Sequence, residues 1–503
     1  MNKPSLKLSF IPIVCLVALL VVSVKLFGED VLGGAIQIVL LLATALTCLI
    51  SFWKSRTPWE RFEQGFIKSV SNSIPAILVL LLIGAMAGTW MASGIIPGMI
   101  YYGLDVINPK FFLVTVCIVA SLISLSTGGS WTTIATVGVG LMGIGRALGF
   151  EEGWVAGAVI SGAYFGDKVS PLSETTNMAA TVAESNLFSH IKYMMFTTLP
   201  AFVISLIIYF VYGLWGHHSG EMLTDGLAES IASNYNISPW LFISPAIVMF
   251  MIFKKLPSIV VLFTGVLLGC ITMAVAQPQM ITLLAGDASV VSSIKVAMQS
   301  AYGAMAPDTG NEMLNSLVAT KGMYGMLNTV WLIICAMSFG GSLEVSGMLD
   351  TITDAMIKKM KGVFSTVAST TASCLFLNVA TADQYISILL PGKMFSSVYD
   401  KQGYRPELLS RTLEDAGTVT SVLVPWNSCG MTQASVLGVA TIVYMPFAFF
   451  NWLSPVMTLL IAALGIGVFS KKVKEESFEL LSEELETVPQ ELPELEEQLA
   501  MAK

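Results

Sequence analysis

Apolar runs long enough to cross a membrane recur along the whole chain, and polar residues interrupt many of them. A transmembrane α-helix needs about 20 mostly apolar residues, and the runs at 8–27, 32–53 and 193–215 meet that length. The runs at 131–148 and 153–166 are shorter and stop at a glycine or a charged side chain. Such pieces must be half-helices or re-entrant hairpins, because lipid does not tolerate unpaired backbone. The sequence therefore predicts an all-α integral membrane protein with about ten transmembrane helices, two re-entrant hairpins and broken helices.

The composition argues against several other classes of protein. Only 12% of the 503 residues are charged, against about 25% in a soluble domain. No basic stripe is interleaved with aromatic residues, so the expected partner is the lipid bilayer and not nucleic acid. Seven scattered cysteines and three histidines favour neither a disulfide framework nor a zinc site, and no cofactor is expected. A membrane-embedded enzyme is disfavoured because H-E-x-x-H and G-x-S-x-G are missing from the sequence. A channel is a further, weaker alternative.

The distribution of lysine and arginine predicts how the chain is oriented, because basic residues concentrate in cytosolic loops. One alternating path places every basic cluster in the cytosol: Lys3 with Lys7, residues 54–68, Lys254–Lys255, Lys358–Lys361 and Lys471–Lys474. The acidic segment 216–236 contains no lysine or arginine and is expected outside. Both termini are then cytosolic.

The chain repeats itself at an offset of 253 residues. Glycine or polar interruptions coincide in the two copies at three places: Gly88 with Gly341, Ser130 with Asp383 and, after one inserted residue, Pro171 with Pro425. The basic clusters make the copies opposite in orientation, as in secondary transporters that bind their substrates at interrupted helices. The predicted segments are a two-helix extension (1–53), a first transport repeat (54–215), linking helices (216–300), an inverted second repeat (301–470) and an acidic cytosolic tail (471–503).

Two breaks of the first repeat carry groups suited to a small cation. In the break at 126–130, two glycines lie between the hydroxyls of Thr127 and Ser130. The break within 162–180 contains three charged side chains and several oxygen donors: Asp167, Lys168, Glu174, Ser170, Ser173, Thr176 and Asn177. Ionisable groups at membrane depth are costly and usually functional. A plain hairpin tip and a solvated loop remain the alternatives for the two breaks.

The second repeat has milder counterparts of these breaks. Their candidate residues are Asn378 and Asp383 in one break and Asn427 and Ser428 in the other. Glu414 and Asp415 lie upstream of the second break. From the sequence, Asp415 can equally lie near the cytosolic surface with Arg411.

The stretch GAYFGDKVSPLSETTN (162–177) resembles the signature of the NhaC-type Na⁺/H⁺ antiporters, a family that also includes Na⁺-coupled malate/lactate antiporters. Length and hydrophobic layout fit that family over nearly the whole chain outside the acidic tail. The family usually has an aspartate where this chain has Glu174, so the carboxylate is kept but is one methylene longer. The resemblance implies a multi-pass protein of the bacterial or archaeal cytoplasmic (inner) membrane that exchanges Na⁺ for H⁺.

The expected chemistry is competition of Na⁺ and H⁺ for one carboxylate, because only the ionised form binds the cation. Asp167, Ser173 and Thr176 are the predicted Na⁺ ligands. Asp167 follows an apolar half-helix directly, so it is the first candidate for the carrier, and Glu174 is the second. If Asp167 instead forms a salt bridge with Lys168, it stays ionised and is structural.

An organic-acid exchanger of the malate/lactate type is the alternative function within transporters. It needs a cation or a half-helix N-terminus that faces the substrate carboxylate. Lys168 is the candidate cation for that role. The sequence also leaves open whether the protein is a homodimer.

Overall fold

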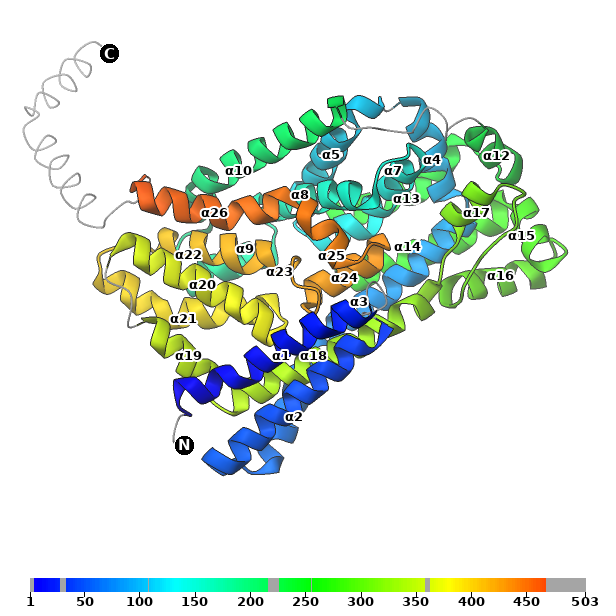
Figure 1. The fold of residues 1–503 in the computed structure, drawn as a ribbon. Coiled ribbons are helices and arrows are strands. Elements are labelled where there is room, and N and C mark those ends of the chain that lie inside the picture. The colour runs from blue at the N-terminus through cyan, green and yellow to red at the C-terminus, as the bar shows by residue number, and fades with distance from the viewer. Residues whose placement is uncertain are drawn as a thin grey trace, which may run out of the picture.

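The computed structural model describes residues 4–27, 33–106, 108–215, 226–254, 256–357 and 362–466. The regular structure in these ranges is helical, with one isolated β-bridge between Met305 and Thr320. Eight of the described helices are long and apolar enough to cross a membrane, or up to 11 spans if each of three sharply bent pairs counts as one. The prediction of an all-α membrane protein with broken helices is therefore confirmed (Figure 1). The cluster Lys358–Lys361 and the predicted tail 471–503 lie outside the described residues.

The described elements fall into three consecutive groups. The first comprises α1 (Leu6–Phe27), α2 (Ala35–Ser55), α3 (Trp59–Ala92), α4 (Ile95–Val106), η2 (Pro109–Phe111), α5 (Phe112–Thr127), α6 (Ser130–Thr133), the π-helical turn η3 (Ile134–Gly138), α7 (Val139–Ala147), α8 (Glu152–Val169), α9 (Glu174–Val182) and α10 (Leu187–Trp215). The second comprises α12 (Leu227–Asn234), η4 (Pro239–Phe242), α13 (Ile243–Phe253), α14 (Ser258–Ala276), α15 (Pro278–Ala285), α16 (Val290–Tyr302) and α17 (Glu312–Val318). The third comprises α18 (Gly322–Val345), α19 (Met348–Ile357), α20 (Val363–Thr381), α21 (Gln384–Lys401), α22 (Pro406–Leu413), the π-helical turn η5 (Glu414–Thr418), α23 (Val419–Ser421), α24 (Ser428–Leu437), α25 (Thr441–Tyr444), η6 (Met445–Phe447) and α26 (Phe449–Leu464).

The long helices α3 and α18, which match each other in the repeat, pack side by side in opposite directions. Gly65 near the start of α3 lies against Val345 at the end of α18, and Gly84 lies against Gly322 at the start of α18. A Cβ atom on Gly84 would come within 2.7 Å of the Gly322 carbonyl oxygen. Small residues thus permit the close approach that lipid-embedded helices use in place of a hydrophobic driving force. The antiparallel packing of matching helices supports the inverted orientation inferred from the basic clusters.

Backbone geometry corrects the register of the repeat at the first break. Residues in the left-handed conformation follow matching helices in both copies: Gly94 with Gly347 (φ 76° and 70°) and Gly128 with Ala382 (φ 70° and 57°). The first pair is 253 residues apart and the second 254, so the inserted residue precedes the break instead of following it. Asp383 therefore matches Gly129, and its pairing with Ser130 is wrong. Two apolar helix sequences can be aligned almost equally well in registers that differ by one residue. The residue at which each helix ends fixes the register, because it occupies a single position.

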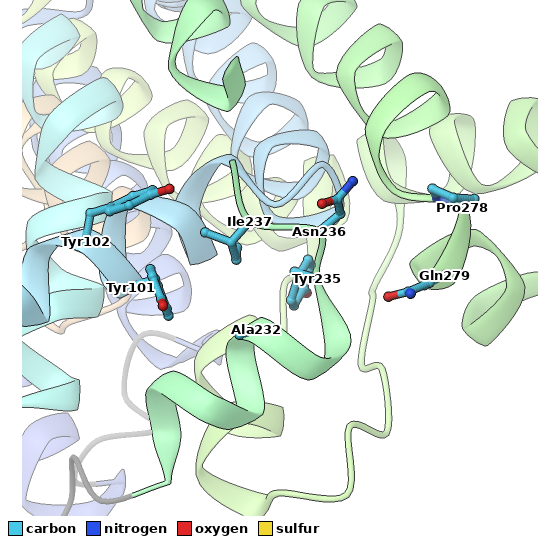
Figure 2. A pocket seen from close by; sticks show the side chains of 8 residues that line it. All are labelled: Tyr101, Tyr102, Ala232, Tyr235, Asn236, Ile237, Pro278 and Gln279. Carbon is cyan, nitrogen blue, oxygen red and sulfur yellow. The ribbon is translucent and has the colours of Figure 1, made fainter. Parts of the chain in front are cut away.

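The remaining helices surround the repeated elements. α1 and α2 lie beside α18 and α19 (Figure 1), and Gln37 of α2 donates a 3.2 Å hydrogen bond to the Asn328 side chain of α18. Among the linking helices, α14 packs along α3, where Trp90 Nε1 bonds the Gly265 carbonyl at 2.9 Å. A cavity of about 520 Å³ opens between α4, α12 and α15 and includes Tyr101 and Tyr235 in its lining (Figure 2). The division into repeats and linking helices stays a prediction.

Candidate functional site

Asp167 joins the two breaks of the first repeat. It lies in the last turn of α8, and its side chain is only 7% exposed. Its Oδ2 atom accepts hydrogen bonds from the Ser130 backbone N–H (3.0 Å) and hydroxyl (2.7 Å) at the start of α6. Its Oδ1 atom has no hydrogen-bond partner among the described residues. One carboxylate oxygen is therefore anchored, and the other is available to a ligand.

The two hydroxyl residues predicted to bind Na⁺ with Asp167 lie at the start of α9. Ser173 is the N-cap of α9, accepts a 3.4 Å bond from the Thr176 backbone N–H and lies beside the Asp167 carboxylate. The Thr176 hydroxyl donates a 3.0 Å bond to the Lys168 carbonyl. A hydroxyl that donates its proton keeps oxygen lone pairs. Both residues therefore combine a structural contact with the capacity to bind a cation.

Other predicted site residues of the first repeat fix the shape of the breaks. The Ser170 hydroxyl donates to the Leu125 carbonyl at 2.7 Å, which ties the end of α8 to α5. Asn177 donates to the carbonyls of Pro171 (2.9 Å) and Ser173 (2.7 Å). The Thr127 hydroxyl lies 3.3 Å from that of Thr133.

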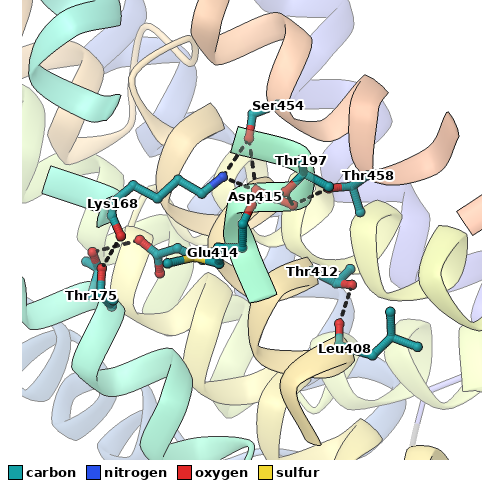
Figure 3. A network of polar contacts seen from close by, with 11 residues as sticks. Lys168, Thr175, Thr197, Leu408, Thr412, Glu414, Asp415, Ser454 and Thr458 are labelled. Atoms are coloured by element: carbon teal, nitrogen blue, oxygen red, sulfur yellow. Dashed lines mark hydrogen bonds and ion pairs between the residues drawn. The ribbon is translucent and has the colours of Figure 1, made fainter. Parts of the chain in front are cut away.

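Lys168 and Asp415 form a fully buried ion pair between α8 and η5 (Figure 3). Asp415 also accepts hydrogen bonds from three hydroxyls: Thr197 of α10 (2.8 Å), Ser454 of α26 (3.0 Å) and Thr458 of α26. Lys168 is thus paired with the second repeat and not with Asp167, so the predicted alternative of an Asp167–Lys168 salt bridge is wrong. The placement of Asp415 at the cytosolic surface with Arg411 is also wrong, because both side chains are completely buried.

Glu414 is a further buried carboxylate, and it was not among the residues predicted to bind an ion. Its Oε1 atom accepts a 3.0 Å bond from the Thr175 hydroxyl of α9, and its Oε2 atom has no partner among the described residues. Asp167 lies within its electrostatic range. In the sequence, the two adjacent acidic residues at 414 and 415 inside the apolar stretch 407–426 were the feature that could have indicated a buried carboxylate there. The π-helical turn η5 adds a second signal that appears only in the structure, since such turns are frequent at functional sites.

Glu174, the second candidate for the carrier, is exposed at the start of α9. Its Oε2 atom accepts a 3.1 Å hydrogen bond from the Tyr385 hydroxyl of α21. Asp167 is therefore the more deeply buried of the two candidate carboxylates. This agrees with the prediction from the apolar half-helix that precedes it.

The candidate residues of the second repeat mainly bond one another and the backbone. Asn427 donates to the Asn378 carbonyl at 3.1 Å, and the Ser428 backbone N–H donates to the Ala382 carbonyl at 2.8 Å. Asn378 donates to the Gly417 carbonyl at 2.7 Å, which attaches the break to η5. Asp383 caps α21 through a 2.9 Å bond from the Ile386 backbone N–H. In each repeat, one break lies against the other break of that same repeat.

The two pairs of breaks then meet across the repeats. The Lys168–Asp415 pair, the Thr175–Glu414 bond and the Tyr385–Glu174 bond all cross this junction. Asp415 is balanced by Lys168, whereas Asp167 and Glu414 each keep one oxygen without a partner among the described residues. Each of those two carboxylates therefore has an oxygen atom to which a cation or a proton can bind.

Comparison with known proteins now decides the family. Residues 162–466 match the Na⁺/H⁺ antiporter family, and the match begins at the stretch that contains Asp167 and Lys168. The chain belongs to the Na⁺/H⁺ antiporter family. This antiporter is therefore a multi-pass membrane protein of a transporter family, as its helices and broken spans indicate.

Three relatives of this antiporter cover most of its length. It is 38% identical over 413 residues to the Na⁺/H⁺ antiporter NhaC of Alkalihalophilus pseudofirmus, which covers 82% of this chain and 87% of that protein. It is 34% identical over 412 residues to the malate-2H⁺/Na⁺-lactate antiporter of Bacillus subtilis, and the match covers 82% of this chain and 83% of that protein. It is 31% identical over 478 residues to the arginine/ornithine antiporter ArcD of Halobacterium salinarum, and the match covers 94% of this chain and 95% of that protein.

Proposed function

We propose that this antiporter exchanges Na⁺ for H⁺ across the cytoplasmic membrane and that Asp167 carries both ions. The observation behind this proposal is the buried Asp167 carboxylate, with Oδ2 held by Ser130 and Oδ1 without a partner among the described residues. An ionised carboxylate binds Na⁺, and a protonated carboxylate does not. Because the two ions compete for one group, binding of either releases the other, and transport becomes an exchange.

The oxygen atoms around Asp167 complete the proposed Na⁺ site. Ser173 lies beside the carboxylate, Thr176 is one turn into the same helix, and Ser130 contacts Oδ2. Hydroxyl and carboxylate oxygens suit a hard cation, which needs replacements for its water ligands. The hydrogen bonds of Ser170, Asn177, Asn378 and Asn427 keep the interrupted backbone satisfied around this site.

We assign the second exchangeable carboxylate to Glu414 instead of Glu174. Glu414 is fully buried, whereas Glu174 is exposed and accepts a bond from Tyr385. The charge of Asp167 acts on Glu414, so a cation or proton bound at one carboxylate changes the affinity of the other. Asp415 takes no part in the exchange, because Lys168 and three hydroxyls already compensate its charge.

Alternating access follows from the two inverted repeats, which open the shared site to one side of the membrane at a time. In this orientation both termini and residues 54–68 are cytosolic, and residues 216–236 are external. The basic residues in 54–68 and the acidic composition of 216–236 support that orientation.

The deciding experiment measures collapse of a preformed pH gradient in proteoliposomes that contain the full chain. Addition of Na⁺ is expected to collapse the gradient, with Li⁺ and K⁺ tested alongside to define selectivity. A response to malate or lactate without any response to Na⁺ alone would favour the organic-acid exchanger. No response to any of these ions would contradict antiport of either kind.

A further inference from the structure

Gly138 and Gly392 occupy matching positions in the two repeats. They are 254 residues apart, which is the spacing between Gly128 and Ala382 at the ends of α5 and α20. Gly138 lies in η3 and Gly392 in α21, so each glycine follows a break by about two helical turns. The helix is irregular at both positions, because η3 is a π-helical turn and Pro391 interrupts the hydrogen bonds of α21. Helices bend at such positions.

Branched apolar side chains close on Gly392 from two other helices. A Cβ atom at this position would lie only 2.2 Å from Cγ1 of Val182 in α9 and 3.1 Å from Cδ1 of Leu413 in α22. These three residues form the Gly392 cluster. The space at its centre admits a methyl group only if a neighbouring side chain moves.

Gly138 has the matching neighbours. A Cβ atom there would lie 3.0 Å from Cγ1 of Val159 in α8 and 3.4 Å from Cδ2 of Leu437 in α24, and these three residues form the Gly138 cluster. Val159 precedes Leu413 by 254 residues, and Leu437 ends α24 as Val182 ends α9. In each cluster, two residues come from one repeat and the third comes from the other. A change in the relative position of the repeats therefore acts on both clusters.

The two glycines lie on the returning arms of two hairpins. The second hairpin consists of α20 and α21, and its ends meet where the Thr366 hydroxyl donates a 2.9 Å hydrogen bond to the Gln402 side chain. The first hairpin runs from α5 to α7, and at its ends the ring centres of Phe112 and Phe150 are 5.0 Å apart. The tips of both hairpins are the breaks that carry candidate site residues. Along each hairpin, the cluster therefore lies between the candidate site and the ends.

The two hairpins enter from opposite ends of the spanning helix α10. Near the start of α10, His190 Nδ1 lies 2.7 Å from the hydroxyl of Ser410 in α22, which follows the second hairpin. Near its end, Gly213 packs against the carbonyl of Lys110 at the start of the first hairpin. α10 has 29 residues and is long and apolar enough to cross the membrane. The clusters therefore face opposite sides, and in the proposed orientation the Gly392 cluster faces the cytosol.

A cavity of about 550 Å³ reaches the Gly392 cluster from that side. Val182 of the cluster lines it, together with side chains of α21, α22 and the turn after α9. Its charged lining residues are Glu184, Lys393 and Asp400. These side chains leave a negative charge in excess, which favours the entry of cations over anions. On the other side of the cluster, Leu413 directly precedes Glu414, whose carboxylate accepts the bond from Thr175.

We propose that the two clusters are alternating gates of the ion path and that the cavity is its cytosolic entrance. An apolar constriction without room for water blocks an ion, and glycine permits the close contact that forms it. Because each cluster joins the two repeats, a rocking motion between them can separate one cluster while the other stays closed. Both clusters are in contact in the structure, so both gates are closed. Gating of this kind rests on the proposed antiport, since exchange requires that the site never opens to both sides at once.

The test is the accessibility of a cysteine behind the gate. Thr175→Cys, in a chain that lacks the seven native cysteines, is labelled with a membrane-impermeant thiol reagent in inverted and in right-side-out vesicles. Gly392→Ala should hold the cytosolic gate ajar and raise the labelling rate from the cytosolic side roughly tenfold or more. It should also slow Na⁺-driven exchange, which is measured separately with Thr175 intact. Adding Val182→Ala makes room for the new methyl group and should return both rates toward those of the parent.

Two further variants test the second gate and provide the control. Gly138→Ala should raise labelling of the same cysteine from the external side only. Gly362→Ala, at the start of the second hairpin, should change neither labelling nor exchange, because a Cβ atom there meets no atom within 4 Å.

Two outcomes would overturn the gates. The first is that Gly392→Ala is labelled at the same rate as its parent. The second is that Gly392→Ala slows exchange and Val182→Ala does not restore it, because Gly392 would then serve packing alone. Absence of Na⁺-driven exchange in the wild type would count against the proposed antiport and not against the gates, because labelling requires no transport.

Discussion

Lys168 of α8 and Asp415 of η5 form an ion pair across 247 residues of sequence, and both side chains are completely buried. Ser454 bonds to both members of the pair, and Thr197 and Thr458 bond to Asp415. The network thus connects α8 and η5 with α10 and α26 (Figure 3). A polar network with satisfied groups specifies one arrangement of the helices around it. It holds α8, and therefore Asp167, in a fixed position relative to Glu414.

Removing one member of this pair is expected to destabilise the protein strongly. Lys168→Met leaves Asp415 buried without its cation and should lower the free energy of unfolding by about 3–5 kcal/mol. The double variant Lys168→Met/Asp415→Asn removes both charges and keeps a side chain that can bond the hydroxyls. In thermal unfolding in detergent, the double variant should unfold at a clearly higher temperature than Lys168→Met. Equal stability of the single and double variants would mean that the pair is not coupled.

Asp167→Asn is expected to abolish Na⁺-dependent proton movement while the protein still folds and inserts. The amide cannot bind or release a proton, but its oxygen can still accept the Ser130 hydrogen bonds. Gradient collapse in proteoliposomes is the measurement. The exposed residue Asp308 provides the control, since it lies in the loop between α16 and α17 and Asp308→Asn removes a carboxylate outside the broken segments. Normal exchange by a well-expressed Asp167→Asn variant would remove Asp167 from the mechanism.

Ser130→Ala is expected to weaken Na⁺ binding without abolishing exchange. The change removes the 2.7 Å hydroxyl bond to Oδ2 and leaves the 3.0 Å backbone bond in place. A hydrogen bond to a charged group contributes about 1.5–3 kcal/mol, so the Na⁺ concentration for half-maximal exchange should rise roughly tenfold or more. Ser130→Thr restores the hydroxyl and should recover most of the affinity. An unchanged Na⁺ dependence in Ser130→Ala would argue against a role of this contact in binding.

Glu414→Gln is expected to reduce exchange much more than Glu174→Gln. The first change removes a buried carboxylate that bonds Thr175, and the second removes an exposed one. Glutamine can still accept the 3.0 Å bond from Thr175, so folding should be preserved. Initial rates of gradient collapse at saturating Na⁺ separate the two variants. If Glu174→Gln instead reduced the exchange rate more than Glu414→Gln, the second exchangeable carboxylate would be Glu174.

Cysteine labelling tests the predicted orientation of the chain in the membrane. Glu229→Cys in α12 and Glu60→Cys in α3 both place a thiol at an exposed position, in a background that lacks the seven native cysteines. A membrane-impermeant reagent should label residue 229 from outside and residue 60 only after permeabilisation, because basic residues surround residue 60 and not residue 229. The reverse pattern would contradict the predicted orientation of residues 54–68 and 216–236.

The sequence alone determined the class of the protein and the location of the interrupted segment that contains Asp167. Hydropathy shows which segments enter lipid, and the glycines and Pro171 show where helices stop, because both properties belong to short stretches of chain. The position of Asp167 directly after an apolar half-helix correctly indicated that it is the deeper of the two candidate carboxylates, since Asp167 is buried and Glu174 is exposed. The stretch 162–177 also indicated the family, which the match over 162–466 confirms.

Only the tertiary structure decided how the charges are paired. The neighbour of Lys168 in sequence is Asp167, but successive residues of a helix point in different directions, and Lys168 meets Asp415 from the other repeat. The burial of Glu414 and Arg411, and the slip of one residue before the first break, likewise depend on which distant helices pack together. An ionisable group acquires its role from the charges and hydrogen-bond donors around it in space. In a bundle of similar apolar helices, those neighbours are set by packing and leave almost no mark on the local sequence.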